Sequence, residues 1–160
     1  MSTSIKEQIA AAVLARLLTV TTGNGYEVSL SSVTRPDRKG KNWVPTHLAA
    51  RLVQGDSMIV DDEEGAVGFL TWEQDFVVRV YASPPESSTE AIDTVLNAAE
   101  ASIWKAVMTD PRWTAGPAVL ALDTRAGDVP SFDGQDGTYS VRFLTFTVLF
   151  RHRWNDPYSQ

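Results

Sequence analysis

The sequence predicts an α+β domain, with a mainly antiparallel sheet of four to five strands and two helices packed on one face of it. Two amphipathic segments with helical periodicity lie far apart in the chain. The segments between and after them alternate apolar and polar side chains, as strands do. Because the strands group together instead of alternating strictly with helices, the predicted element order is α-β-β-β-α-β-β.

The first helix is expected to begin after Ser4. Ser4 and Glu7 have the spacing of a capping box, in which side chains satisfy two backbone amides that a helix start leaves without partners. Gly23-Asn24-Gly25 is expected to end the helix. The apolar stripe is formed by Ile5, Ile9, Val13 and Leu17 at every fourth position, with Leu14 and Leu18 beside them.

Three strands are expected to follow, at residues 26–30, 48–52 and 69–81. In each of them apolar side chains alternate with others, which is the pattern of a strand with one buried face. The second strand is expected to stop at Gly55-Asp56-Ser57. The third is about as long as the last strand of the chain, so the two are predicted to be antiparallel neighbours.

The second helix is predicted to run to about Met108, where Asp110-Pro111 ends it. Ser87 and Glu90 repeat the capping-box spacing at its start. A short buried strand is expected at residues 118–124 and a mobile, glycine-containing loop at 125–138. The stripe facing the sheet is predicted to consist of Ile92, Leu96, Ala99, Ile103 and Val107.

The last strand, at residues 139–152, is the most unusual element. It alternates for fourteen residues without a glycine or proline. At roughly 3.3 Å per residue it would span about 46 Å, whereas a compact domain of this size is roughly 40 Å across. We therefore expect part of this strand to project or to pair outside its own subunit.

The composition is that of a single soluble domain covering residues 1–160, with a flexible C-terminal tail at 154–160. The chain is 43% hydrophobic and 21% charged, which argues against disorder. It has no cysteine, so disulfides and thiolate metal sites are excluded and a reducing compartment is favoured. Neither a signal peptide nor a membrane-spanning segment is expected.

No catalytic constellation is found, so we expect no enzyme activity, cofactor or metal. The two histidines, His47 and His152, lack ligand-type residues at helical spacing. Asp133-Gly134-Gln135-Asp136-Gly137 lacks the spacing of a calcium loop and is predicted to be a turn. There is no phosphate-binding loop and no nucleophile elbow.

Charge is distributed unevenly along the chain. The net charge is −6, but residues 1–54 carry +4, residues 55–95 carry −9 and the remainder carries −1. These segments are either solvated loops or complementary faces that meet between subunits, and the basic loop could also contact nucleic acid.

Trp104, Trp113 and Trp154 are candidates for core or interface anchors. The candidate interface residues are Arg35, Arg38, Lys39 and Lys41 in the basic loop, Asp61, Asp62, Glu63 and Glu64 in the acidic turn, and Trp154 and Tyr158 near the C-terminus.

The layout resembles the tail terminator proteins of long-tailed bacteriophages, also called minor tail or tail-to-head joining proteins. The resemblance covers nearly the whole chain. It is carried by the opening helix ahead of Gly25-Tyr26-Glu27-Val28, by Phe76-Val77-Val78-Arg79-Val80-Tyr81, by Met108-Thr109-Asp110-Pro111-Arg112-Trp113, by Phe146-Thr147-Val148-Leu149-Phe150-Arg151, and by the ending Asn155-Asp156-Pro157-Tyr158.

The resemblance implies an α+β subunit without catalytic residues that forms a homohexameric ring. Such a ring would cap the completed tail tube, end tube polymerisation and join the tail to the head connector. The implied partners are further copies of the chain, the tail tube protein and a connector or neck protein, with genome DNA passing through the lumen without specific binding. The implied location is the virion tail or neck, assembled in the host cytoplasm.

Two alternative functions also fit the sequence. The first is another head-tail completion or neck protein, since these also form rings from small subunits. The second is a small intracellular ligand-binding domain in which Trp72, Phe76 and Phe143 line a pocket instead of a core. A stable monomer whose melting temperature rises with a ligand would favour the second.

Overall fold

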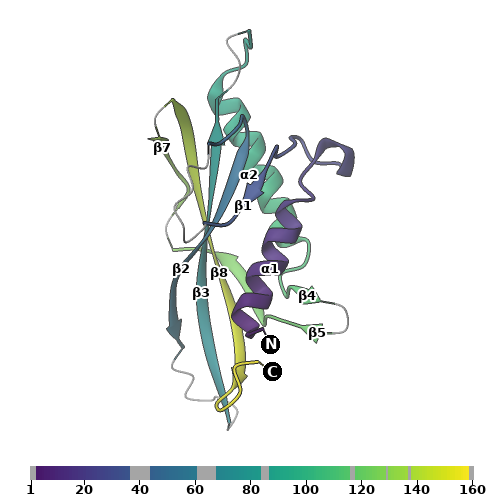
Figure 1. The fold of residues 1–160 in the computed structure, drawn as a ribbon, viewed down its shortest axis with the longest axis vertical. Helices are drawn as coiled ribbons and strands as arrows, with labels where there is room; N and C mark the ends of the chain where they lie inside the picture. The colour runs from purple at the N-terminus through teal and green to yellow at the C-terminus, as the bar shows by residue number, and fades with distance from the viewer. Residues whose placement is uncertain are drawn as a thin grey trace.

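The protein is an α+β domain with two helices on one side of a mixed, six-stranded sheet (Figure 1). The computed structural model describes residues 3–36, 44–60, 68–83, 87–115, 118–128, 130–136 and 138–158. The predicted class is confirmed, but the sheet has more strands than expected and one of its pairs is parallel. The main sheet has the order β1-β2-β3-β8-β6, and β7 also pairs with β8.

Helix α1 (Ile5–Leu17) buries Ile5, Ile9, Val13 and Leu17 of the predicted stripe, whereas Leu14 is only partly buried and Leu18 is exposed. The Ser4 hydroxyl accepts a hydrogen bond from the Glu7 amide at 3.3 Å, which is half of the predicted capping box. The Glu7 carboxylate instead forms an ion pair with Arg35. The helix ends at Leu17, and Gly25, at a φ of 81°, follows a short 3₁₀ turn, η1 (Thr22–Asn24). Glycine tolerates this left-handed conformation without steric cost.

The strand predicted at residues 26–30 is wrong. Tyr26 and Val28 are partly buried against the core, but the segment packs beside helix α2 (Ile92–Met108) and not on the sheet edge. The Ser102 hydroxyl accepts from the Glu27 amide, and the Lys105 ammonium lies 5.3 Å from the Tyr26 ring centroid. Alternation here therefore reflects packing on a helix. The first strand is instead β1 (Val33–Thr34), which pairs in parallel with β2 (Ala49–Ile59).

The two longest strands form the centre of the sheet, as predicted. β3 (Phe69–Ala82) and β8 (Tyr139–Arg153) are antiparallel, with a continuous register from Phe69↔Arg153 to Ala82↔Ser140. From Ser140 to Arg153, β8 is therefore paired with β3 of the same chain. The two strands run on past the N-terminal end of α1 (Figure 1), and pairing of β8 outside its own subunit stays a prediction.

Strand β2 continues beyond the predicted stop. Its register with β3 shifts between Gln54 and Ser57, which marks a β-bulge at Gly55 and Asp56. The buried Gln74 amide donates to the carbonyls of Gly55, at 3.0 Å, and Asp56, at 3.1 Å. These bonds stabilise the bulge, and beyond it β2 pairs with β3 again as far as Ile59.

The single strand predicted at 118–124 and the loop predicted at 125–138 are also wrong. β5 (Ala118–Val119) pairs with β4 (Thr114–Ala115) in a separate sheet. β6 (Asp123–Ala126) and β7 (Phe132–Asp136) both pair with β8. Leu120 and Ala121 turn into the core between β5 and β6, which interrupts the strand.

The second predicted capping box is wrong as well. Helix α2 has Ala91 at its N-cap, without a side-chain hydrogen bond. The Ser88 hydroxyl accepts from the Glu90 amide outside the helix. The body of the helix is as predicted, because Leu96, Ala99, Ile103 and Val107 are all buried and Ile92 packs against them.

The core lies between the helices and one face of the sheet. In the central strands this face carries Phe76, Val78, Leu144 and Phe146, and the Phe76 and Phe146 rings stack at 5.4 Å. Since side chains alternate along a strand, the intervening residues form the opposite face. We call this second surface the helix-free face.

Candidate functional site

The end of the sheet that extends past α1 carries several exposed apolar side chains. We call it the sheet tip and define it by Met58 and Ile59 of β2, residues 68–70 of β3, and residues 152–158. Four of its large side chains are well exposed: Met58 at 62%, Ile59 at 52%, Trp154 at 70% and Tyr158 at 50%. Exposed aromatic and aliphatic side chains are enriched at protein-binding surfaces.

The C-terminal segment is bonded to the sheet tip. The Trp154 amide donates to the Gly68 carbonyl at 2.8 Å, and the Ile5 amide donates to the Pro157 carbonyl at 3.1 Å. The Asp156 carboxylate accepts from the Tyr158 amide at 3.0 Å. These bonds tie residues 154–158 to β3 and α1. The flexibility expected of the tail stays a prediction.

A small pocket opens beside the sheet tip, between the start of α1 and the sheet. It has a volume of about 220 Å³. Trp72 stacks on His152 with 5.9 Å between ring centroids, and the buried Trp72 indole nitrogen has no hydrogen-bond partner among the described residues. Lys6 donates to Ser57 at 3.0 Å across the rim. The lining residues are Ser4, Lys6, Ser57, Trp72, Phe150, His152 and Pro157.

The aromatic residues of the ligand-binding alternative do not come together. Only Trp72 lines the pocket at the sheet tip. Phe76 is fully buried in the core, and Phe143 lies on the helix-free face, where it stacks on Phe132 at 4.5 Å. The three rings therefore do not form one cavity.

The predicted interface residues are only partly described by the structure. Trp154 and Tyr158 are exposed at the sheet tip. Arg35 is held against α1 by Glu7, and its hydrogen bond lowers the pKa of Glu7. The remaining predicted residues lie outside the described residues: Arg38, Lys39, Lys41, Asp61, Asp62, Glu63 and Glu64.

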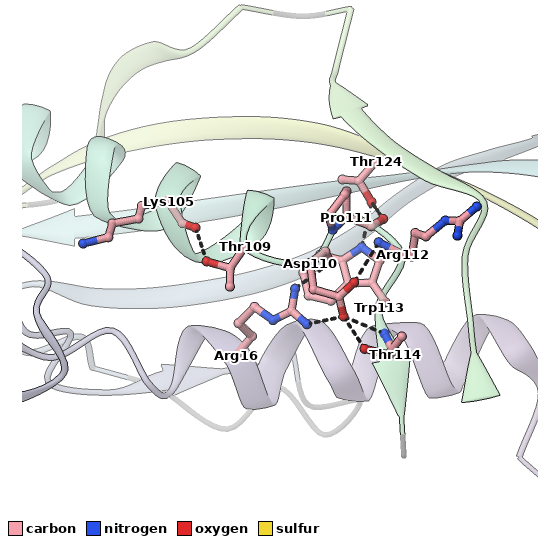
Figure 2. Close-up of polar contacts among 9 residues, drawn as sticks. All are labelled: Arg16, Lys105, Thr109, Asp110, Pro111, Arg112, Trp113, Thr114 and Thr124. Carbon is pink, nitrogen blue, oxygen red and sulfur yellow. Dashed lines mark hydrogen bonds and ion pairs between the residues drawn. The ribbon is translucent and has the colours of Figure 1, made fainter. Parts of the chain in front are cut away.

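The densest polar cluster surrounds Asp110, after the end of α2 (Figure 2). One carboxylate oxygen of Asp110 accepts from the Thr114 amide at 2.7 Å, the Thr114 hydroxyl at 2.6 Å and Arg16 at 3.1 Å. The other accepts from the Arg112 amide at 3.2 Å. Arg16 also donates to the Asp110 carbonyl at 2.7 Å, which fastens α1 to the turn that leaves α2. These contacts hold the turn after α2 and join it to α1.

The same turn places a tryptophan in the core. Trp113 has a φ of 52° and is fully buried. Its indole nitrogen donates to the Thr124 hydroxyl at 2.8 Å, and that hydroxyl donates to the Pro111 carbonyl at 2.6 Å (Figure 2). The Arg16 guanidinium lies 4.2 Å from the Trp113 ring centroid. Of the three tryptophans proposed as anchors, Trp113 is thus a core residue, Trp104 packs partly buried against the core and Trp154 is a surface residue.

The Asp110 cluster predicts an acid-sensitive contribution to stability. Burial by itself would raise the pKa of Asp110, but the hydrogen bonds from Thr114, Arg16 and Arg112 outweigh it and lower this pKa to about 2. An aspartate in the unfolded chain has a pKa of about 3.9. The stabilisation is therefore fully present above the unfolded pKa and is lost as the pH falls through about 2.

Chemical denaturation of the wild type and of Asp110→Asn from pH 6 to pH 2 measures this effect. The free energy of unfolding should be higher for the wild type at pH 6, and the difference should shrink by about 2 kcal/mol toward pH 2. A difference that stays constant over this range would contradict the assignment.

Among the described residues, no group of three or more histidine, cysteine or acidic side chains is placed to hold a metal ion. No helix in this part of the chain is long and apolar enough to cross a membrane. Comparison of the sequence with protein-family models and with curated proteins finds no match.

Sequence reasoning missed half of the sheet tip. Met58 and Ile59 follow Gly55-Asp56-Ser57, which was interpreted as the end of a strand. The sequence feature that could have pointed to these residues is a pair of large apolar side chains directly before an acidic segment. Met58 lies opposite Glu73 and Ile59 opposite Trp72, and this placement depends on the bulge and on the β2–β3 register, neither of which follows from local alternation.

Proposed function

We propose that this protein is a structural subunit of a bacteriophage tail. In this role it forms a homo-oligomeric ring, with six copies expected, that caps the tail tube, ends tube polymerisation and joins the tail to the head connector. The ring would belong to the tail or neck of the virion, after assembly in the host cytoplasm. The sheet tip is the single observation that carries the proposal.

The sheet tip fits a capping role for a physical reason. A subunit that stops a polymer must present a rigid surface to the last polymer subunit, because flexible contacts lose affinity to ordering entropy. The continuous β3–β8 ladder supplies that rigidity, and Met58, Ile59, Trp154 and Tyr158 supply contact area at its end. Tryptophan and tyrosine are common among the residues that contribute most to binding.

Assembly on tail tubes tests the proposal. The native mass of the purified protein would be measured by light scattering, followed by negative-stain imaging with tubes grown from the tube protein of the same genome. The expected result is rings at one end of the tubes, which stop growing when the protein is added. A monomer that leaves tube growth unchanged would overturn the proposal. Binding to filled heads but not to tubes would indicate another neck role.

The pocket beside Trp72 keeps the ligand-binding alternative open as a second candidate. Its volume of about 220 Å³ is below the roughly 300 Å³ at which ligand pockets usually begin. A small aromatic molecule would have to stack in it near Trp72 and His152. A monomer that ignores tubes but whose melting temperature rises with such a ligand would favour this candidate.

A further inference from the structure

The pocket beside the sheet tip differs in charge from other cavities in the described part of the chain. Its described lining includes the Lys6 ammonium and the hydroxyl groups of Ser4 and Ser57, but no carboxylate. A groove of about 300 Å³ beside α2 is lined by Asp93 and Asp133, and a cavity of about 70 Å³ beside the β-bulge is lined by several acidic residues. These acidic cavities would repel an anion, whereas the pocket at Lys6 would attract one.

A third cavity, of about 500 Å³, contains a cation that is already paired. This cation is Arg16, which forms an ion pair with Asp110 and lies over the Trp113 ring. Lys6 has no such acid, because every ion pair among the described residues is made by an arginine. The Lys6 ammonium donates to the Ser57 hydroxyl at 3.0 Å. Since an ammonium has three donors, two more are available for an acceptor in the pocket.

The two serines add donors in the same pocket. The Ser57 hydroxyl accepts from Lys6, and the Ser4 hydroxyl accepts from the Glu7 amide. A hydroxyl that accepts in this way keeps its own hydrogen to donate. Ser4 and Lys6 also lie at the start of α1, where the helix dipole favours a negative charge. These polar groups therefore fit an anion that accepts several hydrogen bonds, as a carboxylate does.

The rest of the lining is aromatic and apolar. Trp72 and His152 stack with 5.9 Å between ring centroids, and Phe150 and Pro157 also line the pocket. The His152 ring is fixed by its Nδ1, which donates to the Arg153 carbonyl at 2.8 Å. The volume of about 220 Å³ is below the roughly 300 Å³ at which pockets for whole ligands usually begin. This pocket therefore suits a single acidic group on a short apolar stem.

We propose that the pocket binds a carboxylate on a short apolar stem, supplied by an acidic side chain of the protein that docks on the sheet tip. The pocket adjoins the tip, because His152 and Pro157 belong to both and Ser57 precedes Met58 in β2. This inference deepens the proposed function and rests on it, since the docked protein is then the tube protein. Pairing of Lys6 with an acid of the tube would fix the orientation of each copy on it.

A small carboxylate tests the chemistry of the pocket without the tube. The probe is butyrate, which has the shape of a glutamate side chain, and the matched control is the neutral butyramide. Binding is followed through the indole N–H resonance of Trp72 in heteronuclear NMR spectra, assigned with Trp72→Phe. Butyrate should shift this resonance, and butyramide at the same concentration should give at most a tenth of the shift. Equal shifts with the two compounds, or no shift with butyrate, would overturn the proposal.

Variants of Lys6 test the role of its charge. Lys6→Gln should reduce the shift with butyrate at least fivefold, and Lys6→Arg, which keeps the charge, should retain most of it. Arg112→Gln is the matched control for the loss of one positive charge, because Arg112 is exposed in the turn after α2, outside the pocket. It should respond as the wild type does. A full response from Lys6→Gln would contradict the assignment.

The acidic turn of the chain itself is a rival source of the carboxylate. Its residues follow β2 in the sequence and lie outside the described residues. If they occupied the pocket, butyrate would shift the Trp72 resonance only after all four were replaced by amides. This result would overturn the proposal, because the ligand would then belong to the same chain. The variant carries Asp61→Asn, Asp62→Asn, Glu63→Gln and Glu64→Gln.

Tube binding identifies the source of the carboxylate and separates the two proposals. Lys6→Glu should lower the affinity for tail tubes at least tenfold without changing the native mass. If butyrate binds through Lys6 but Lys6→Glu caps tubes normally, the ligand is a free acid and the tube contact is wrong. If butyrate does not bind and Lys6→Glu caps normally, the pocket is wrong and the proposed function stands. A wild type that ignores tubes contradicts the proposed function, while the response to butyrate still decides whether the pocket takes a carboxylate.

Discussion

Replacing Trp113 by alanine is expected to lower the free energy of unfolding by about 3–5 kcal/mol, a large share of the stability of a domain of this size. Trp113 is the largest fully buried side chain, and its ring packs on Phe146 with 6.3 Å between centroids. The substitution leaves a cavity, removes the cation–π contact with Arg16 and leaves Thr124 without its donor. Denaturant titration followed by circular dichroism measures the loss.

Two variants separate the contributions to this effect. Trp113→Phe keeps most of the ring volume but removes the hydrogen bond to Thr124, so it should cost about 1–2 kcal/mol. Trp154→Ala is the matched control, since it deletes the same side chain from an exposed site and should change stability by less than about 0.5 kcal/mol. Equal losses from Trp113→Ala and Trp154→Ala would contradict the burial of Trp113.

The sequence predicts best those elements whose own periodicity determines their packing. The buried stripes of α1 and α2 and the two long central strands follow from repeats of three to four or two residues. Residues 26–30 show the limit of this reasoning. Their alternation is real, but their partner is α2, and periodicity does not say whether an apolar face packs on a helix or on a sheet.

Contacts between distant residues account for the other differences. Gly55 was interpreted as a strand end, yet Gln74, nineteen residues away, donates to its carbonyl and lets β2 continue. Gly127 lies so close to β8 that an added Cβ would approach the Thr145 side chain to 2.5 Å, so the supposed loop is a strand connection pressed against the sheet. Neither partner can be identified from the local sequence.

The residues of the candidate site also differ in whether the sequence alone could predict them. Trp154 and Tyr158 could be proposed from the sequence because large aromatic residues in a polar ending are unusual. Met58 and Ile59 could not, because β2 reaches them only past the bulge. One residue of slip would move Arg79 to the core face and Val78 to the helix-free face.

Replacing Trp154 by alanine is expected to weaken binding of the protein to tail tubes by about 30-fold to 1,000-fold. This range corresponds to the roughly 2–4 kcal/mol that a central tryptophan contributes to an interface. Trp154 is the most exposed of the large side chains at the sheet tip, and its amide is fixed to Gly68, so its loss removes contact area without loosening the fold. Sedimentation of the variant with preformed tubes measures the change.

The location of Trp154 makes this prediction specific to tube binding. Trp154 is 70% exposed and the backbone bond of residue 154 to Gly68 does not need the indole, so the native mass of Trp154→Ala should equal that of the wild type. Leu18→Ala is the control for a general loss of exposed apolar surface, because Leu18 is 55% exposed at the end of α1, outside the sheet tip. It should bind tubes normally. Equal tube binding by Trp154→Ala and the wild type would show that the tip is not the capping surface.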